Sequence, residues 1–271
     1  MPDLTPSPRR LAYLRAKRRE KGAIRSLQVF LLIFFLILWE VSARLGWIDA
    51  FIVSCPSRVA ATVTGLYQSG DLWLHLWTSC AETAAGFVLG TLSGTLIAVL
   101  LWWSTFLSRV LDPYLVVLNA LPKTALGPIF IVWIGAGTAS IVAMTLAISL
   151  IVTILNMLVG FLSTDEQKLR LLRSMGASRG QILRKLVLPA NFPALFNTLR
   201  VNVGLSWVGV IMGEFLVSKA GLGYLIVYGS QVFNMDLVMA SVLVLAAAAV
   251  VMYQIVLWLE KFLKKYLGVI A

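Results

Sequence analysis

Charged residues are scarce in this chain of 271 residues: only 13% are Asp, Glu, Lys or Arg, about half the share that is typical of soluble domains. Apolar residues make up 59% of the chain, and its mean hydropathy is +0.89. A soluble protein of this composition could hardly cover its surface with polar groups, so the sequence predicts an integral membrane protein. The net charge of +11 does not indicate a nucleic-acid partner, because the cations gather beside apolar runs, as membrane topology requires.

Residues that build metal sites and catalytic groups are also few. The chain has two cysteines, Cys55 and Cys80, and one histidine, His75, and neither CxxC nor HExxH spacing occurs. We therefore expect no metal site. The cysteines are predicted to be unpaired small apolar residues, although a disulfide stays open if both face an oxidising side. His75 lies outside the expected spans and is predicted to be a surface or interfacial residue, which disfavours a membrane-embedded enzyme.

Long apolar runs are what the chain does have. Six of them reach the roughly 20 residues that a bilayer crossing needs, and they cover 27–45, 80–103, 113–134, 138–162, 193–217 and 237–260. The first run is interpreted as a retained anchor rather than a cleaved signal peptide, because the cationic segment before it is long and no small-residue cleavage site follows. The sequence thus predicts an all-α protein with six transmembrane helices.

Clusters of cations set the expected orientation. They occupy the N-terminal segment 1–26, the loop after the fourth run and the C-terminal tail 261–271. By the positive-inside rule all three are cytoplasmic, and six crossings return the chain to the same side. The segment 46–79 is then external.

Glycines spaced four apart mark helix faces that can approach each other closely. Gly86, Gly90 and Gly94 form such a ridge in the second run, and Gly209 and Gly213 repeat it in the fifth. In lipid, where no hydrophobic effect drives helices together, small residues of this kind favour tight helix packing. The ridges predict a bundle and indicate nothing about chemistry.

The loop at 163–190 is the most distinctive local pattern, with five cations and no acid between residues 170 and 189. Ser163-Thr164-Asp165-Glu166 fits a capping box, which predicts a helix that begins near Thr164. An apolar stripe at helical spacing follows, made of Leu169, Leu172 and Met175.

A glycine divides this loop into two short helices. Gly176 can adopt the left-handed conformation that ends a helix, and Ser178 with Gln181 fits a second capping box. The second helix has one apolar face, made of Ile182, Leu183, Leu186 and Val187. Such a loop can lie on anionic lipid, or it can dock on a partner protein.

The loop resembles the EAA signature of the permease subunits of bacterial ABC importers. Gly176 matches the signature's glycine, nine residues follow, and then Leu186 and Leu188-Pro189 close the pattern. The chain departs from the signature at the triplet, where Arg170-Leu171-Leu172 replaces Glu-Ala-Ala.

Further stretches extend the resemblance over residues 45 to 260: "CPSRV" (55–59), "LPKTALGPIFIVWIGAG" (121–137) and "WVGVIMGEFLVSKAGLGYLI" (207–226). They look most like the branch that imports nitrate, sulfonates, taurine and thiamine-precursor-like pyrimidines.

The resemblance implies a type I ABC permease fold in a bacterial inner membrane. Residues 27–45 would be an accessory helix, and 80–260 a five-helix permease core with a cytoplasmic coupling loop. Two permease copies would enclose the pathway; a homodimer is expected and a heterodimer stays open. Two ATP-binding subunits and an external substrate-binding protein would complete the importer.

The same resemblance makes the loop the contact to the ATPase. The implied coupling residues are Leu169, Leu172, Met175, Gly176, Ala177, Leu186, Leu188 and Pro189. The chain itself has no G-x-x-x-x-G-K-[ST] loop, so we expect it to be non-catalytic and to bind no cofactor, with ATP and Mg²⁺ on the partner subunits.

Polar residues inside the apolar runs are the candidates for the translocation pathway, because they are costly to place in lipid. They are Lys123, Asn119, Asn202, Trp207 and Glu214. Lys123 lies beside Pro122, where a membrane helix can break, and could attract an anionic substrate, snorkel, or pair with an acid. Glu214 could equally serve helix packing. The expected substrate is a small anion or a pyrimidine-like nutrient; an ion-coupled secondary transporter is the alternative function.

Overall fold

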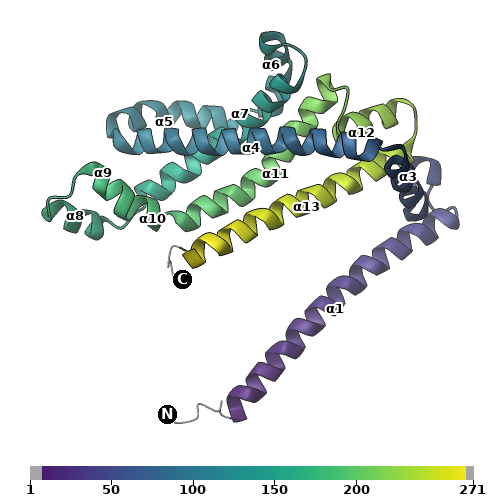
Figure 1. Ribbon diagram of the computed structural model, residues 1–271, viewed down its shortest axis with the longest axis horizontal. Helices are drawn as coiled ribbons and strands as arrows, with labels where there is room; N and C mark the ends of the chain where they lie inside the picture. Colours follow the sequence, from purple (N-terminus) through teal and green to yellow (C-terminus); the bar gives the residue numbers. More distant parts are fainter. Residues whose placement is uncertain (1–7, 267–271) are drawn as a thin grey trace. The chain divides into compact units, whose positions relative to one another are not determined.

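The computed structural model describes residues 8–266, and every regular element in that range is helical (Figure 1). The chain divides into two compact units, Met1–Thr62 and Val63–Ala271. The outer parts of the two predicted basic tails, residues 1–7 and 267–271, lie outside the described residues.

The first unit is built around one long apolar helix. Its apolar side chains between residues 27 and 38 are almost all exposed, as expected of a helix that faces lipid. The elements of this region are α1 (Pro8–Arg44), α2 (Ala50–Val53) and α3 (Pro56–Ser69), the last of which continues into the second unit.

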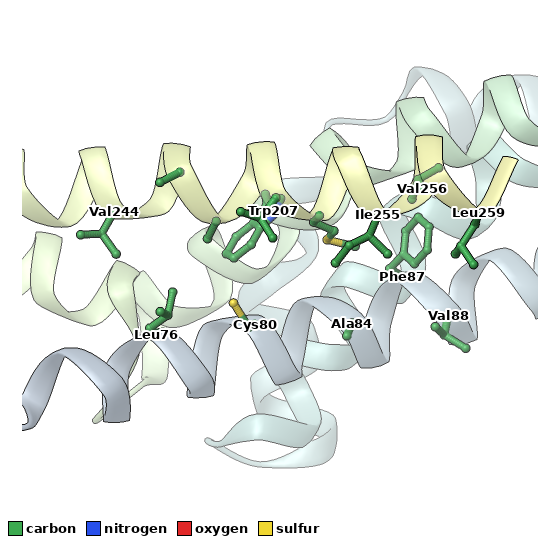
Figure 2. A pocket seen from close by; sticks show the side chains of 14 residues that line it. Leu76, Cys80, Ala84, Phe87, Val88, Trp207, Val244, Ile255, Val256 and Leu259 are labelled. Atoms are coloured by element: carbon green, nitrogen blue, oxygen red, sulfur yellow. The ribbon is translucent and has the colours of Figure 1, made fainter. Parts of the chain in front are cut away.

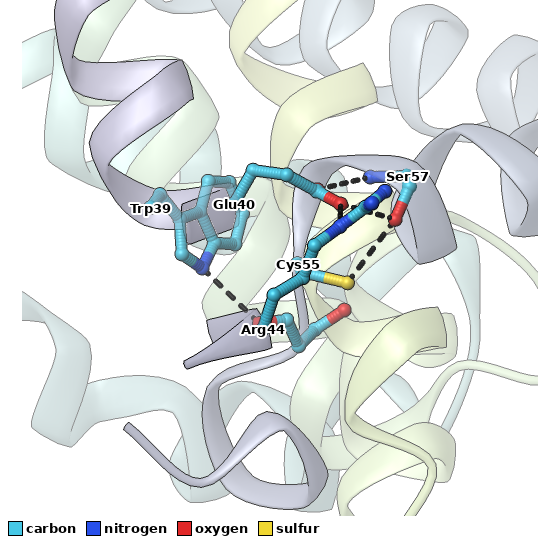
Figure 3. A network of polar contacts seen from close by, with 6 residues as sticks. Trp39, Glu40, Arg44, Cys55 and Ser57 are labelled. Atoms are coloured by element: carbon cyan, nitrogen blue, oxygen red, sulfur yellow. Dashed lines mark hydrogen bonds and ion pairs between the residues drawn. The ribbon is translucent and has the colours of Figure 1, made fainter. Parts of the chain in front are cut away.

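A polar network joins the end of α1 to the start of α3 (Figure 3). The Glu40 carboxylate accepts hydrogen bonds from the Ser57 N–H (3.0 Å) and the Ser57 hydroxyl (2.9 Å), and it pairs with Arg44 at 2.7 Å. Trp39 Nε1 donates to the Ser54 carbonyl at 3.2 Å. These contacts fix the turn between the two helices.

The second unit is a bundle with a set of short helices at one end. Its elements are α4 (Asp71–Trp103), α5 (Thr105–Ala120), η1 (Lys123–Leu126), α6 (Gly127–Ile134), α7 (Thr138–Leu162), α8 (Glu166–Ser174), α9 (Arg179–Ile182), the π-helical segment η2 (Leu183–Val187), α10 (Leu188–Ala190), α11 (Phe192–Val217), α12 (Leu222–Gln231) and α13 (Met235–Tyr266).

The glycine ridges pack as predicted, with α7 lying along both α4 and α11 (Figure 1). A methyl group added to Gly94 would come within 2.6 Å of Thr153 Cβ, and one added to Gly209 within 2.7 Å of Thr145 Cα. The hydroxyls of Thr145 and Thr153 donate to backbone carbonyls of α7. The small residues therefore let the helices touch while the hydroxyls of Thr145 and Thr153 stay hydrogen-bonded.

Within the described residues, five helices are long and apolar enough to cross a membrane. The count reaches six if α5 and the η1–α6 segment form one span, but this pair is bent by 90°. The run expected at 113–134 is divided beside Pro122, where the sequence allows a membrane helix to break: the helix ends at Ala120, because Pro122 has no N–H and restricts Leu121 to an extended backbone.

The second span also differs from its predicted limits. Its helix begins at Asp71 rather than at residue 80, so residues 71–79, predicted to belong to an external segment, continue the helix of the span. This extension carries His75 and Ser79 on the same helix as Glu82.

Candidate functional site

The first helix of the basic loop begins later than predicted. Asp165, not Ser163, is the residue that caps α8, and its carboxylate accepts from the Gln167 N–H at 2.9 Å. Ser163 instead ends α7 and donates its hydroxyl to the Gly160 carbonyl. The capping box predicted from Ser163 is wrong because this serine is already the C-cap of the preceding helix.

The turn and the second cap are confirmed. Gly176 has a φ of +79°, which is the left-handed conformation, and the Ala177 N–H donates to the Leu172 carbonyl at 3.0 Å. Ser178 and Gln181 form the reciprocal capping box, with hydrogen bonds of 3.3 and 2.8 Å. The loop is therefore a helix, a glycine turn and a second helix.

The second helix is not a continuous α-helix, because a π-helical segment follows α9. Pro189 has no N–H to donate to the residue four positions before it, and the Leu188 N–H reaches back to the Leu183 carbonyl instead. This widened turn separates the loop helices from α11.

Apolar side chains hold the loop on the bundle. Leu169, Leu172 and Ala177 are partly buried against the core cluster that contains Phe161, which is fully buried. The Arg179 guanidinium also donates to the carbonyl of Trp103, the last residue of α4, at 3.0 Å. The loop is thus attached to the ends of both α4 and α7.

The predicted coupling residues fall into two groups. In the first group, Leu188 packs against the same core cluster as Leu169, Leu172 and Ala177. Leu186 and Pro189 belong to this group as well and are half-buried. Gly176 and Met175 are exposed, and the Met175 side chain is 73% accessible. Leu171, which stands in the triplet and which sequence reasoning did not select, is 59% accessible.

Two predicted pathway residues meet where the α5–α6 pair bends. The Lys123 ammonium, on η1, donates to the Asn119 carbonyl (2.9 Å) and to the Asn119 side-chain oxygen (3.4 Å). Lys123 is half-buried and Asn119 is exposed. Both oxygens that accept from this ammonium are neutral.

Asn202 is fully buried and bridges three helices. From α11, its amide nitrogen donates to Thr91 on α4 (3.1 Å) and to Thr153 on α7 (2.7 Å). Its side-chain oxygen has no hydrogen-bond partner. This geometry is typical of an interhelical tie.

Trp207 lies in an apolar cleft between α4 and α13, with a volume of about 610 Å³ (Figure 2). The indole is 5% exposed, and its Nε1 has no hydrogen-bond partner. Around it the cleft is lined by apolar side chains such as Leu76, Phe87, Val244 and Leu259. Such a lining suits acyl chains or another helix and offers nothing to a polar substrate.

Glu214 belongs to a polar cluster that sequence reasoning mostly missed. The Ser79 hydroxyl donates to one of its carboxyl oxygens at 2.5 Å, and the Gly223 N–H donates to the other at 2.5 Å. Glu82 lies against Glu214, and His75, predicted to be on the surface, is buried and accepts from the Gly221 N–H. The spacing of His75, Ser79 and Glu82 on one helical face was the available signal, once the helix begins at Asp71.

Known proteins resemble this chain over most of its length. Residues 86–267 match the family model described as "Binding-protein-dependent transport system inner membrane component". A "Probable ABC transporter permease protein" of Haemophilus influenzae is 32% identical over 87% of this chain and 96% of its own length. The "Putative aliphatic sulfonates transport permease protein SsuC" of Bacillus subtilis is 28% identical (84% and 83%). The "Formylaminopyrimidine transport permease protein ThiX" of Halalkalibacterium halodurans is 30% identical (76% and 81%).

Solved structures agree on the fold. A chain of the bacterial ABC transporter involved in the import of the acidic polysaccharide alginate has a TM-score of 0.63 to this chain, with 13% sequence identity, and the match covers 92% of this chain and 98% of the other. At this identity the likeness concerns the helical arrangement alone. The family match and the 32% identical relative show that the chain belongs to the binding-protein-dependent transport system inner membrane components, the permease subunits of ABC transporters.

Proposed function

We propose that two copies of this chain enclose the pathway of an ATP-driven importer in a bacterial inner membrane. Six crossings result when the bent α5–α6 pair counts as one. The basic loop and both termini then lie in the cytoplasm, which the clustered cations support. In this arrangement α1 is an accessory helix and the helices from α4 to α13 form the permease core.

The basic loop is the proposed docking element for two ATP-binding subunits. One observation carries this proposal: Met175 and Leu171 project from the tip of a basic loop whose inner face is locked to the bundle. Exposed apolar side chains beside cations suit a protein surface with an apolar groove and an acidic rim. Because the loop also contacts the ends of α4 and α7, a movement of the ATPase would reach the spans directly.

This chain is proposed to be the non-catalytic part of the importer. ATP and Mg²⁺ would be bound by the partner subunits, and an external binding protein would deliver the substrate. The permease would contribute the pathway and the conformational change, without a cofactor of its own.

The substrate is proposed to be a small anion such as a sulfonate, taurine or nitrate. Lys123 supports this choice, because its ammonium lies at a break between helices and its recorded partners are neutral oxygens. The similarity to a sulfonate permease points the same way. A pyrimidine-like nutrient is the second candidate, which the similarity to a formylaminopyrimidine permease favours.

Uptake into proteoliposomes tests this function. The chain is reconstituted with its ATPase and binding protein, and the ATP-dependent uptake of labelled taurine, nitrate and formylaminopyrimidine is compared. We expect uptake of an anion that Lys123→Gln abolishes and that Lys219→Gln, at an exposed cation, leaves intact. Uptake of the pyrimidine alone, or an anion uptake that Lys123→Gln does not change, would contradict the anionic site. Uptake by the chain without the ATPase would support a secondary transporter instead.

A further inference from the structure

At the end of the bundle opposite the basic loop, hydrogen bonds from backbone N–H groups hold the turn between α11 and α12 in place. Three consecutive N–H groups of the turn point at side chains of α4 and α11. The hydrogen bonds run from Gly221 to His75 Nδ1 (2.9 Å), from Leu222 to Ser79 Oγ (2.7 Å) and from Gly223 to Glu214 Oε2 (2.5 Å).

This turn fits closely over the Glu214 carboxyl group. Gly221 has a φ of +117°, and a Cβ atom there would collide with the carboxyl group. A Cβ on Gly223 would lie 2.8 Å from Glu214 Oε2. The two glycines are therefore required by the backbone's contact with a buried acid.

A second acid lies against the first. Glu82 and Glu214 are 3% and 2% exposed, and their carboxyl groups interact with each other. Glu82 also interacts with Thr138, at the start of α7. Two carboxylates side by side, away from water, cannot both stay ionised, because each raises the electrostatic energy of the other.

Glu82 also has an oxygen without a partner. Its Oε2 is sealed from solvent and accepts no hydrogen bond. An ionised carboxylate in that position would carry an uncompensated charge, whereas a protonated carboxyl group leaves only one weak acceptor unpaired. By contrast, both oxygens of Glu214 accept hydrogen bonds.

Among the described residues, the groups that interact with the pair include no cation, and Lys219, two residues before Gly221 in the same turn, is exposed. On α4 the titratable neighbours are Asp71, His75 and Cys80, and on α12 Tyr224 stacks on the His75 ring. His75 is neutral in this arrangement, because its Nδ1 accepts the Gly221 N–H and so carries no proton. On α7, the polar group that interacts with the pair is the Thr138 hydroxyl.

We propose that Glu82 and Glu214 bind one proton between them, and that this proton closes a clasp which holds the turn 221–223 on α4. Opening the clasp releases the proton to water and leaves two carboxylates, which separate as α4 moves from the α11–α12 turn. Because the open state has lost a proton, raising the pH favours it and lowering the pH favours the clasp. The clasp involves this bundle end alone, so it does not depend on which substrate the permease carries.

Infrared spectroscopy of the assembled transporter in lipid, with ¹³C-labelled glutamate, tests the proton directly. We expect the carbonyl stretch of a protonated glutamic acid in the wild type at neutral pH, lost in both Glu82→Gln and Glu214→Gln. Glu260→Gln is the control, because Glu260 pairs with Arg200 and Lys264 and should be ionised. A wild type without the band, or a band that survives Glu82→Gln, would overturn the proposal.

Hydrogen exchange of the peptide that contains the turn tests the clasp. The Glu82→Gln substitution gives a neutral side chain of the same size that can donate to Glu214, so it should mimic the protonated pair at every pH. We expect the opening constant of the wild type, corrected for chemical exchange, to rise about tenfold per pH unit over the range in which opening releases the proton, and that of Glu82→Gln to stay flat. The same pH dependence in both proteins would overturn the proposal. If Glu214→Gln does not assemble, the comparison of the wild type with Glu82→Gln still tests the proposal.

Discussion

The two ends of the helical bundle carry charge in opposite ways. At the loop end, Arg170 pairs with Glu166 at 2.7 Å, and both side chains are more than 70% exposed. At the other end, Glu82 and Glu214 are almost fully buried and meet each other. Exposed pairs contribute little and tolerate change, whereas buried acids persist only when every charge is neutralised or hydrogen-bonded. The loop end therefore suits a protein partner, and the acid end suits an internal contact.

Breaking the loop turn should have the largest effect. Proline cannot adopt the φ of +79° that Gly176 has, so Gly176→Pro should separate the two loop helices without changing a span. We expect the variant to insert into the membrane and to lose the ATPase during co-purification. Gly180→Ala is the control, because Gly180 lies in α9 and a methyl group there meets only Trp103, at 3.8 Å.

Equal retention of the ATPase by the wild type and Gly176→Pro would show that the partner docks elsewhere. If neither the wild type nor the variant retained an ATPase, the ATP-driven coupling itself would be in doubt.

At the opposite end, Gly221→Ala should destabilise the bundle by about 2–4 kcal/mol, from a strained φ and the clash with Glu214. Gly135→Ala is a matched control, since Gly135 has nearly the same backbone conformation (φ +99°, ψ 163°, against +117° and 166° for Gly221) and open space around it. It should cost only the backbone strain of about 1–2 kcal/mol. Thermal unfolding in detergent measures both, and equal losses would contradict the close fit of the turn over the carboxyl group.

Between the two ends, Asn202→Ala should cost about 1 kcal/mol, because it removes the hydrogen bonds to Thr91 and Thr153. Asn156→Ala, at an exposed position of α7, should change the unfolding temperature little. A marked loss of uptake in Asn202→Ala, with unchanged stability, would instead assign Asn202 to the pathway.

The smallest effect is expected for the exposed pair of the loop. Arg170→Gln should lower the stability by no more than about 0.5 kcal/mol, because the ion pair with Glu166 is open to solvent. The same measurement of thermal unfolding applies. A loss comparable to that of Gly221→Ala would mean that the two ends do not differ as described.

Local spacing explains why the loop end could be predicted. The Gly176 turn and the Ser178–Gln181 box depend on residues a few positions apart, and both are confirmed. The cap at Asp165 was missed because the sequence does not show that Ser163 belongs to the preceding helix. In the α5–α6 region, Pro122 marked a possible break, but the apolar run did not show that its two parts are bent by 90°.

The acid end could not be predicted in the same way. Ser79 and Glu214 are 135 positions apart, and no local pattern joins them. His75 was assigned to the surface because its helix was expected to begin later, and Glu82 was passed over within an apolar run. Only the packing of α4 against α11 and α12 brings these side chains together.

The most direct test of the account is a cross-link from the loop tip to the ATPase in native membranes. In a background without Cys55 and Cys80, Met175→Cys is treated with a reagent that joins the thiol to nearby amines. We predict a product that contains the ATP-binding subunit, and none from Leu92→Cys, a 65% exposed position within the α4 span. Failure of Met175→Cys to cross-link in an importer that still transports would contradict the proposed coupling through this loop.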